Sequence, residues 1–325
     1  TDIKYNADSN GGNISFKVDR SSIRQGNAVI AIKDVSDAIL WSWHVWVTDE
    51  DINNVIEITN HQNVKYNFMP VNLGQCDGNT ITYEERSCKV KFIAGDQSKE
   101  ITIKQLANVI ATGSNAPFYQ WGRKDPLYPS NGMGNTTKIW YDKEGIPSTA
   151  NPMKGTFSAG NDCIKNCILN PNLMHNRYNG DYTYYNLWSA DNKTTSANDN
   201  PVNKTIYDPC PVGFKLPASN AFTGFTTTGE SVSSSTQVNG TWSSSEKGWY
   251  FYTNSEKTQS IFFPALGYRS YSTMRPGSIG TQGCFWSAHP VAKGNNYYLR
   301  TSSVDVQPTY MVDRGFGYAL RPCQD

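Results

Sequence analysis

Cysteine is the residue of this sequence with the widest chemistry, because thiols serve as nucleophiles, metal ligands and disulfide partners. The chain of 325 residues contains 7 cysteines, so at least one stays unpaired if the others form disulfides. Cys76 and Cys88 flank one predicted hairpin and are a candidate disulfide. Cys163 and Cys167 are separated by one helical turn, a spacing that strains a disulfide if the segment is helical.

Metal binding is weakly signalled. None of the 4 histidines lies in a spacing typical of a zinc site; they are His44, His61, His175 and His289. A calcium ion needs clustered oxygen ligands, and the sequence offers a loose group of carboxylates for it: Asp181, Asp191 and Asp199. We therefore expect no cofactor and no catalytic metal, and a structural calcium ion at these aspartates stays open.

Motifs of the common enzyme classes are absent from the sequence. It contains no G-x-S-x-G, no phosphate-binding G-x-x-x-x-G-K-[ST] loop and no G-x-G-x-x-G after a strand. Cys284, beside Phe285 and Trp286, is interpreted as a small buried residue rather than a nucleophile, since no second positioned thiol lies near it in the sequence. We expect a protein that is not an enzyme.

Aromatic residues form two clusters that would suit a sugar ligand, because the C–H groups of a sugar face stack on aromatic rings. One cluster follows Gly248, and the other comprises Tyr182, Tyr184 and Tyr185. A Gly- and Ser-rich loop at 267–283 would border such a surface with two arginines. The alternative is that the rings belong to the core and the loop is merely solvated. The candidate ligand-binding residues are Trp249, Tyr250, Tyr252, Arg269 and Arg275.

The composition resembles that of many exported β-rich proteins. Charged residues make up 18% of the chain, below the usual value of about 25%. A net charge of +1 provides no long-range attraction to nucleic acid, so we expect no nucleic-acid partner. The sequence has no run of the roughly 18 apolar residues that a membrane-spanning helix requires.

Strand patterns outnumber helix patterns along the chain. The strongest strand is 39–47, and a β meander is predicted from 80–83, 87–93 and 98–105, with one apolar and one wet face. Further strands are expected at 13–18, 28–32, 249–253, 259–263, 284–287, 296–300 and 317–321. Short helical segments are expected at 159–168 and 218–225. The predicted class is therefore β-rich α+β with long loops.

Six ordered motifs resemble those of one known family. They are IRQGNAVIAIKD (23–34), ILWSWHVWVTD (39–49), YQWGRKDP (119–126), TIYDPCPVGFKLP (205–217), FPALGYR (263–269) and ALRPC (319–323). Together they resemble the C-terminal domain of fimbrillin-family surface proteins of Bacteroidota, which is similar to FISUMP-type domains. The resemblance covers roughly residues 20–323.

The resemblance implies a C-type-lectin-like fold. Residues 1–27 would be an N-terminal strand segment left from an upstream β region, and 28–325 a lectin-like domain with a β insertion at about 75–110. It implies a disulfide between Cys210 and Cys323, because such folds often tie the first helical region to the last strand. The nearest match to a calcium-dependent sugar motif, at 307–309, lacks the carboxylate. Thr1 follows no Met and no signal peptide, so we expect a processed or truncated chain.

The function implied by the resemblance is that of a cell-surface adhesin or fimbrial tip subunit, which binds an extracellular ligand such as a glycan. The alternative is a purely structural surface or fimbrial subunit, and a formylglycine-generating-like enzyme is a remote third. Expected partners are other fimbrial or surface subunits, the chain's own cleaved N-terminal region, and a host or bacterial surface ligand. The expected location is extracellular, at the bacterial outer-membrane surface or on a fimbria.

Overall fold

The structure, a computed structural model, describes residues 2–9, 11–78, 80–111, 115–129, 140–141, 147–148, 155, 160–175, 186–191, 196–291 and 294–325. Antiparallel strands dominate these residues, which confirms the β-rich prediction. Helical structure within them is limited to α1 (Gly160–Leu169) and the 3₁₀ turns η1 (Arg20–Ser22), η2 (Ser219–Phe225) and η3 (Ser235–Gln237). No helix in this described part is long and apolar enough to cross a membrane.

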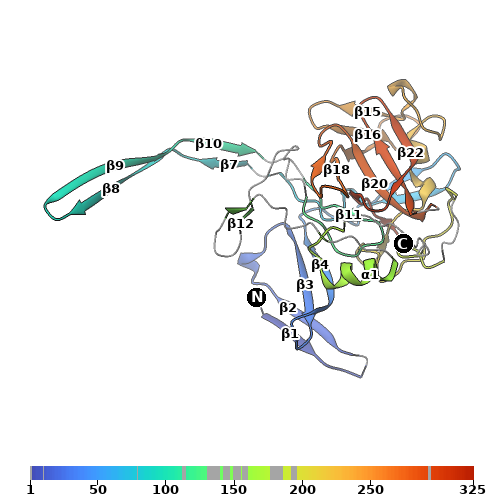
Figure 1. Ribbon diagram of the computed structural model, residues 1–325. Coiled ribbons are helices and arrows are strands. Elements are labelled where there is room, and N and C mark those ends of the chain that lie inside the picture. Colours follow the sequence, from blue (N-terminus) through green and yellow to red (C-terminus); the bar gives the residue numbers. More distant parts are fainter. Residues whose placement is uncertain are drawn as a thin grey trace.

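Two three-stranded sheets form the C-terminal half of the body (Figure 1). One contains β15 (Gly240–Ser243), β16 (Gly248–Tyr252) and β17 (Ser260–Pro264) in chain order. The other contains β20 (Gly283–Pro290), β21 (Asn295–Thr301) and β22 (Val306–Asp313). Chain neighbours pair in both sheets because short connections favour antiparallel hairpins.

Two four-stranded antiparallel sheets bring distant parts of the chain together. One has the order β14 (Phe214–Lys215), β24 (Cys323–Gln324), β6 (Lys65–Phe68) and β5 (Ile56–Thr59). The other has the order β11 (Tyr119–Gln120), β23 (Gly317–Tyr318), β18 (Tyr268–Arg269) and β19 (Pro276–Gly277). Two backbone hydrogen bonds, Met69 N to Pro322 O (2.9 Å) and Leu73 N to Leu320 O (3.0 Å), extend the contact between the C-terminus and β6.

Aromatic side chains fill the core between these sheets. Phe225 stacks on Phe251 with ring centroids 3.9 Å apart, and Phe263 packs edge-on to both rings. A second cluster surrounds Trp121, Trp188 and Trp286. Burial alternates along β16 and β17, as strand geometry requires, whereas every residue of β20 is buried.

The N-terminal region is built from hairpins. β1 (Asp2–Asn6) pairs with β2 (Asn13–Lys17), and β3 (Gly26–Lys33) pairs with β4 (Ile39–Val47), which packs near α1. β12 (Trp140–Tyr141) and β13 (Pro147–Ser148) form a further short pair. The predicted domain boundary between residues 27 and 28 falls inside β3, where Asn27 pairs with Trp46.

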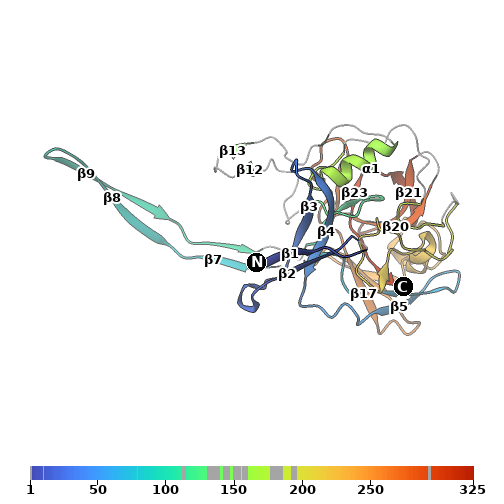
Figure 2. The same cartoon turned by 90° about the horizontal axis from the view of Figure 1, so that it is seen from below.

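Residues 80–111, named the arm here, project away from the body in both Figure 1 and Figure 2. β7 (Thr80–Tyr83) pairs with β10 (Asn108–Ala111), and β8 (Arg86–Ala94) pairs with β9 (Gln97–Gln105). The predicted strands are present, but the meander is wrong. The first strand pairs with a segment beyond the third, so the arm is one long hairpin rather than three neighbouring strands.

β22 was absent from the sequence prediction. Pro308 lies in its middle, and proline is unfavourable inside a strand because it lacks an N–H donor. β22 is an edge strand of its sheet. Its pairing with β21 changes register from Tyr298 to Arg300, and this irregularity accommodates Pro308. A proline at a bulge on an edge strand costs the sheet few hydrogen bonds.

Candidate functional site

The aromatic cluster after Gly248 is divided between two faces of one sheet. On β16, Trp249 and Phe251 point into the core, whereas Tyr250 and Tyr252 point outward. Trp249 is buried, and its indole N–H donates to the carbonyl oxygen of Ser302 at 2.7 Å. The structure therefore places Trp249 in the core rather than on the expected ligand platform.

Two tyrosines and a phenylalanine form the outer surface of the same sheet. The Tyr250 and Phe262 rings lie 4.7 Å apart, since the two residues are paired across β16 and β17. The hydroxyl of Tyr250 donates to Glu246 Oε1 at 2.7 Å, and this bond raises the pKa of the tyrosine. The sequence analysis missed Phe262, although its alternation with buried Phe263 gave the signal.

Polar groups border these half-buried rings. The hydroxyl of Tyr252 lies 2.6 Å from Thr241 Oγ1, and the Lys257 ammonium lies 5.7 Å from the Tyr252 ring centroid. Aromatic rings with hydroxyl, carboxylate and ammonium groups at their edge supply both stacking and hydrogen bonding. This surface, named the aromatic face, comprises Thr241, Glu246, Tyr250, Tyr252, Lys257 and Phe262.

Neither candidate arginine lies in the sheet of the aromatic face. Arg269 is buried on β18, where its guanidinium donates to the carbonyl oxygens of Tyr128 (2.6 Å), Met274 (2.9 Å) and Pro129 (3.0 Å). Burial lowers its pKa to about 10. Arg275 is exposed just before β19. Arg269 therefore fixes a loop internally, and the structure does not bring it to the aromatic face.

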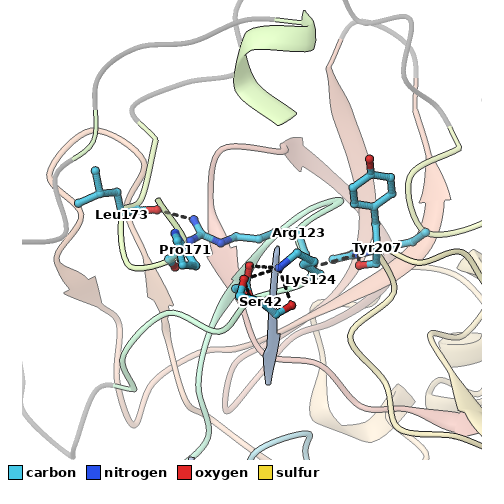
Figure 3. Close-up of polar contacts among 8 residues, drawn as sticks. Ser42, Arg123, Lys124, Pro171, Leu173 and Tyr207 are labelled. Atoms are coloured by element: carbon cyan, nitrogen blue, oxygen red, sulfur yellow. Dashed lines mark hydrogen bonds and ion pairs between the residues drawn. The ribbon is translucent and has the colours of Figure 1, made fainter. Parts of the chain in front are cut away.

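A second polar cluster lies near α1 (Figure 3). Lys124 Nζ donates to the carbonyl oxygen of Ser42 at 2.8 Å and to Asp125 Oδ2 at 2.6 Å, while it lies 4.5 Å from the Trp41 ring centroid. Asp125 also accepts a bond from Ser42 Oγ at 2.9 Å. Burial lowers the pKa of Lys124, and the charge of Asp125 opposes that change. The sequence analysis missed this pair, because the contact with Ser42 joins residues distant along the chain.

Arg123 anchors the segment after α1 (Figure 3). Its guanidinium, which is buried, donates to the carbonyl oxygens of Leu173 (2.5 Å) and Pro171. The Trp188 indole N–H donates to the carbonyl oxygens of Tyr207 (3.0 Å) and Arg123 (3.3 Å). These bonds connect four separate segments of the chain, at Arg123, at Pro171 and Leu173, at Trp188 and at Tyr207.

A pocket of about 540 Å³ opens beside these segments. One wall is α1, and the other is formed by Asn186, Leu187, Ala190, Thr205 and Tyr207. A small cavity of about 20 Å³ shares Ile164, Ile168, Leu187 and Tyr207 with the pocket and reaches Lys124, Asp125 and Cys167. The pocket can accept a small, mainly apolar group, with polar side chains at its inner end.

The two predicted disulfides are not formed in the structure: all seven cysteines are described, and no disulfide joins any of them. Cys88 pairs with Ile103 in the arm, and the extended chain from Thr80 to Cys88 alone spans roughly 25 Å. A disulfide needs Cα atoms within about 7 Å, so the arm separates Cys88 from Cys76.

Cys210 and Cys323 are close enough to influence each other's titration, but they are present as two thiols. Both are buried, and burial raises the pKa of Cys323 to about 12. Cys284 is equally buried, and burial raises its pKa to about 12 as well. A thiol held protonated in this way is a poor nucleophile.

The carboxylates considered for calcium have separate roles. Asp199 accepts hydrogen bonds from Asn60 (2.6 Å), Tyr66 (2.7 Å) and Asn220 (2.9 Å). Asp191 accepts one from Asn203 at 2.8 Å. Asp181, like the cluster Tyr182, Tyr184 and Tyr185, lies outside the described residues. Within the described residues, no three His, Cys, Asp or Glu side chains group in a way that could hold a metal ion.

Comparisons with known proteins provide no relatives for this chain. No protein-family model, no curated protein and no solved structure matches it.

Proposed function

We propose that this chain is a non-enzymatic cell-surface adhesin or fimbrial tip subunit, which binds an extracellular glycan over the aromatic face. The observation that carries the proposal is the paired rings of Tyr250 and Phe262, half-exposed on the outer surface of β16 and β17. Partly exposed rings stack on sugar faces, and the hydroxyl and charged groups at their rim can bind sugar hydroxyls.

The fold proposed for this function is C-type-lectin-like, and the location is the bacterial outer surface or a fimbria. The ordered motifs of the sequence support both. The pairing of the last strand, β24, with β6 and β14 supports a single body closed by its C-terminus. The net charge of +1 also suits neutral carbohydrate better than nucleic acid.

The test is a glycan array probed with the purified chain, with and without calcium, followed by titration of any bound glycan. We expect Tyr250→Ala and Tyr252→Ala each to weaken binding about tenfold, because a lost stacking contact is worth about 1.4 kcal/mol. Tyr310→Ala is the matched control, since Tyr310 is an exposed tyrosine on β22, in another sheet. Equal losses in the three variants, or binding that none of them changes, would refute the aromatic face as the site.

The second candidate is a structural subunit, and the arm favours it. Phe92, Ile101 and Ile103 are exposed on the paired strands β8 and β9, whose outer edges have no strand partner among the described residues. An exposed apolar edge accepts an extended strand from another protein. Replacing residues 84–107 with a short Gly-Ser turn separates the candidates. Loss of incorporation into surface fibres with glycan binding retained supports the assembly role of the arm, whereas normal incorporation excludes it.

A further inference from the structure

Two cysteines of α1 lie beside a histidine and an arginine. Cys163 and Cys167 are one helical turn apart, and the Cys163 side chain is hydrogen-bonded to that of Cys167. Cys167 also has a side-chain hydrogen bond with His175, which follows the helix after a short connection and is itself buried. The sequence placed the two thiols on one helix face, but only the fold adds the imidazole.

The electrostatic surroundings of Cys167 differ from those of the buried thiols Cys210, Cys284 and Cys323. The bond from Cys163, the bond from His175 and the positive charge of Arg123 together hold the pKa of Cys167 well below its usual value, against the opposing effect of burial. Arg123 is fixed in place by the carbonyl oxygens of Pro171 and Leu173. A cationic, hydrogen-bonded surrounding is the one in which protein thiols become reactive.

The Cys167 thiol also borders a small cavity next to the pocket. Cys167 lines the small cavity that shares Ile164, Ile168, Leu187 and Tyr207 with the 540 Å³ pocket. Cys167 is half-buried, whereas Cys163 is buried behind it. Cys167 is therefore the more accessible of the two thiols to a small reagent.

We propose that Cys167 and Cys163 form a redox-active dithiol that exchanges with small-molecule disulfides entering the pocket beside α1. The Cys167 thiolate attacks one sulfur of R–S–S–R, so that a Cys167–S–S–R bond forms and R–S⁻ leaves. Cys163 gives its proton to that thiolate and attacks the Cys167 sulfur, and the second R–S⁻ leaves with the proton first released by Cys167. The net result is one protein disulfide and two molecules of R–SH.

Oxidation would also change the pocket. Side chains one turn apart on a helix have Cβ atoms about 5–6 Å apart, whereas a disulfide requires about 3.5–4.5 Å. Closing the bond must therefore distort the helix between the two cysteines. Ile164 and Ile168 belong to this segment and line the pocket, so its shape depends on the redox state.

The experiment treats the full, folded chain with hydroxyethyl disulfide and maps the modified cysteines by peptide mass spectrometry. In the wild type we expect complete loss of both thiols, with a Cys163–Cys167 disulfide and two equivalents of mercaptoethanol released. Cys163→Ser should instead trap a stable mixed disulfide on Cys167. Cys167→Ser should leave Cys163 unmodified, because the buried thiol lacks its entry partner.

Exposed Cys88 is the internal reference for reagent activity, and it lies in the arm, far along the chain from α1. Should Cys88 become fully modified in the folded wild type while Cys163 and Cys167 stay as thiols, the proposal is overturned. The proposal is also overturned if Cys167 in the Cys163→Ser variant and Cys163 in the Cys167→Ser variant are modified at equal rates. The wild-type map needs no substitution, so it decides the matter even if a variant fails to fold.

Discussion

The C-terminal sheets of the body and the arm are both antiparallel ladders with alternating apolar residues, yet they differ in what covers the apolar side. Phe251, Phe263 and Phe285 on the body strands are 0% exposed. On the arm, Phe92 is 58% exposed, Ile101 is 42% and Ile103 is 53%. The comparison shows that alternation determines which side chains share a face of a strand, whereas burial of that face requires a second layer of structure.

The arm is held together locally. Its β8–β9 ladder runs without a register shift from Arg86 to Ala94, and Lys89 forms an ion pair with Glu100 at 2.9 Å. Surface ion pairs contribute less than about 1 kcal/mol, and an isolated two-stranded ladder is only marginally stable in water. The body instead draws its stability from buried rings. Three predictions, each with a matched control substitution, test this difference.

The largest expected effect is in the body. Phe225→Ala should reduce the free energy of unfolding by about 3–5 kcal/mol, because it leaves a cavity beside Phe251 and Phe263. Phe92→Ala in the arm is the same change at an exposed site and should cost less than about 0.5 kcal/mol. Urea unfolding followed by tryptophan fluorescence measures both. Equal losses would mean that the arm packs on the body in solution.

The second largest expected effect is a decrease in the free energy of unfolding of the body as the pH falls. His289 is buried on β20 and accepts from Ser219 N at 3.3 Å, and burial lowers its pKa to about 4. A neutral, buried histidine contributes stability that is present above its unfolded pKa of about 6.5 and is lost as the pH falls toward 4. Between pH 7.5 and 5 we expect a loss of about 2 kcal/mol from this group.

The pH effect is tested by urea unfolding at both pH values for the wild type and two variants. His289→Gln should remove about 2 kcal/mol of the pH dependence. His61→Gln, at an exposed histidine between β5 and β6, should leave the dependence unchanged. The arm contains no histidine, so its amide exchange should not follow this titration. An unchanged slope in His289→Gln would show that another group causes the pH dependence.

The smallest expected effect is confined to the arm. Gly95 occupies the turn between β8 and β9 with a φ of +59°, a conformation that L-residues adopt at a cost of about 1 kcal/mol. Gly95→Ala should therefore accelerate amide exchange in β8 and β9 about fivefold and leave the urea midpoint of the body unchanged. Asp96→Ala, at the adjacent turn position, is the control. A shift in the urea midpoint would show that the arm and body unfold together.

The predicted strands and helices agree with the structure where the local sequence pattern is strong. The strand at 39–47 and the helix near 159–168 agree with β4 and α1. β22 was missed because Pro308 opposes a strand locally, and only pairing with β21 stabilises it there. The meander was wrong because local alternation does not specify which strands become neighbours.

The candidate site shows the same division. Tyr250 and Tyr252 were found from their aromatic character. The sequence pattern did not show that neighbouring Trp249 is buried whereas the two tyrosines are partly exposed. Phe262 and the Lys124–Asp125–Ser42 cluster were missed, because their contacts cross between elements. The Cys210–Cys323 prediction identified neighbours, whereas the bond itself did not form.

By itself the sequence determined the β-rich class and the position of most of the longer strands and of the helix, because these depend on the side-chain period. The tertiary structure alone decided which rings are covered, which thiol lies beside His175 and Arg123, and which apolar ladder stays exposed. These properties depend on packing between residues far apart in the chain. Burial, and with it each pKa change, is set only when a second layer excludes water.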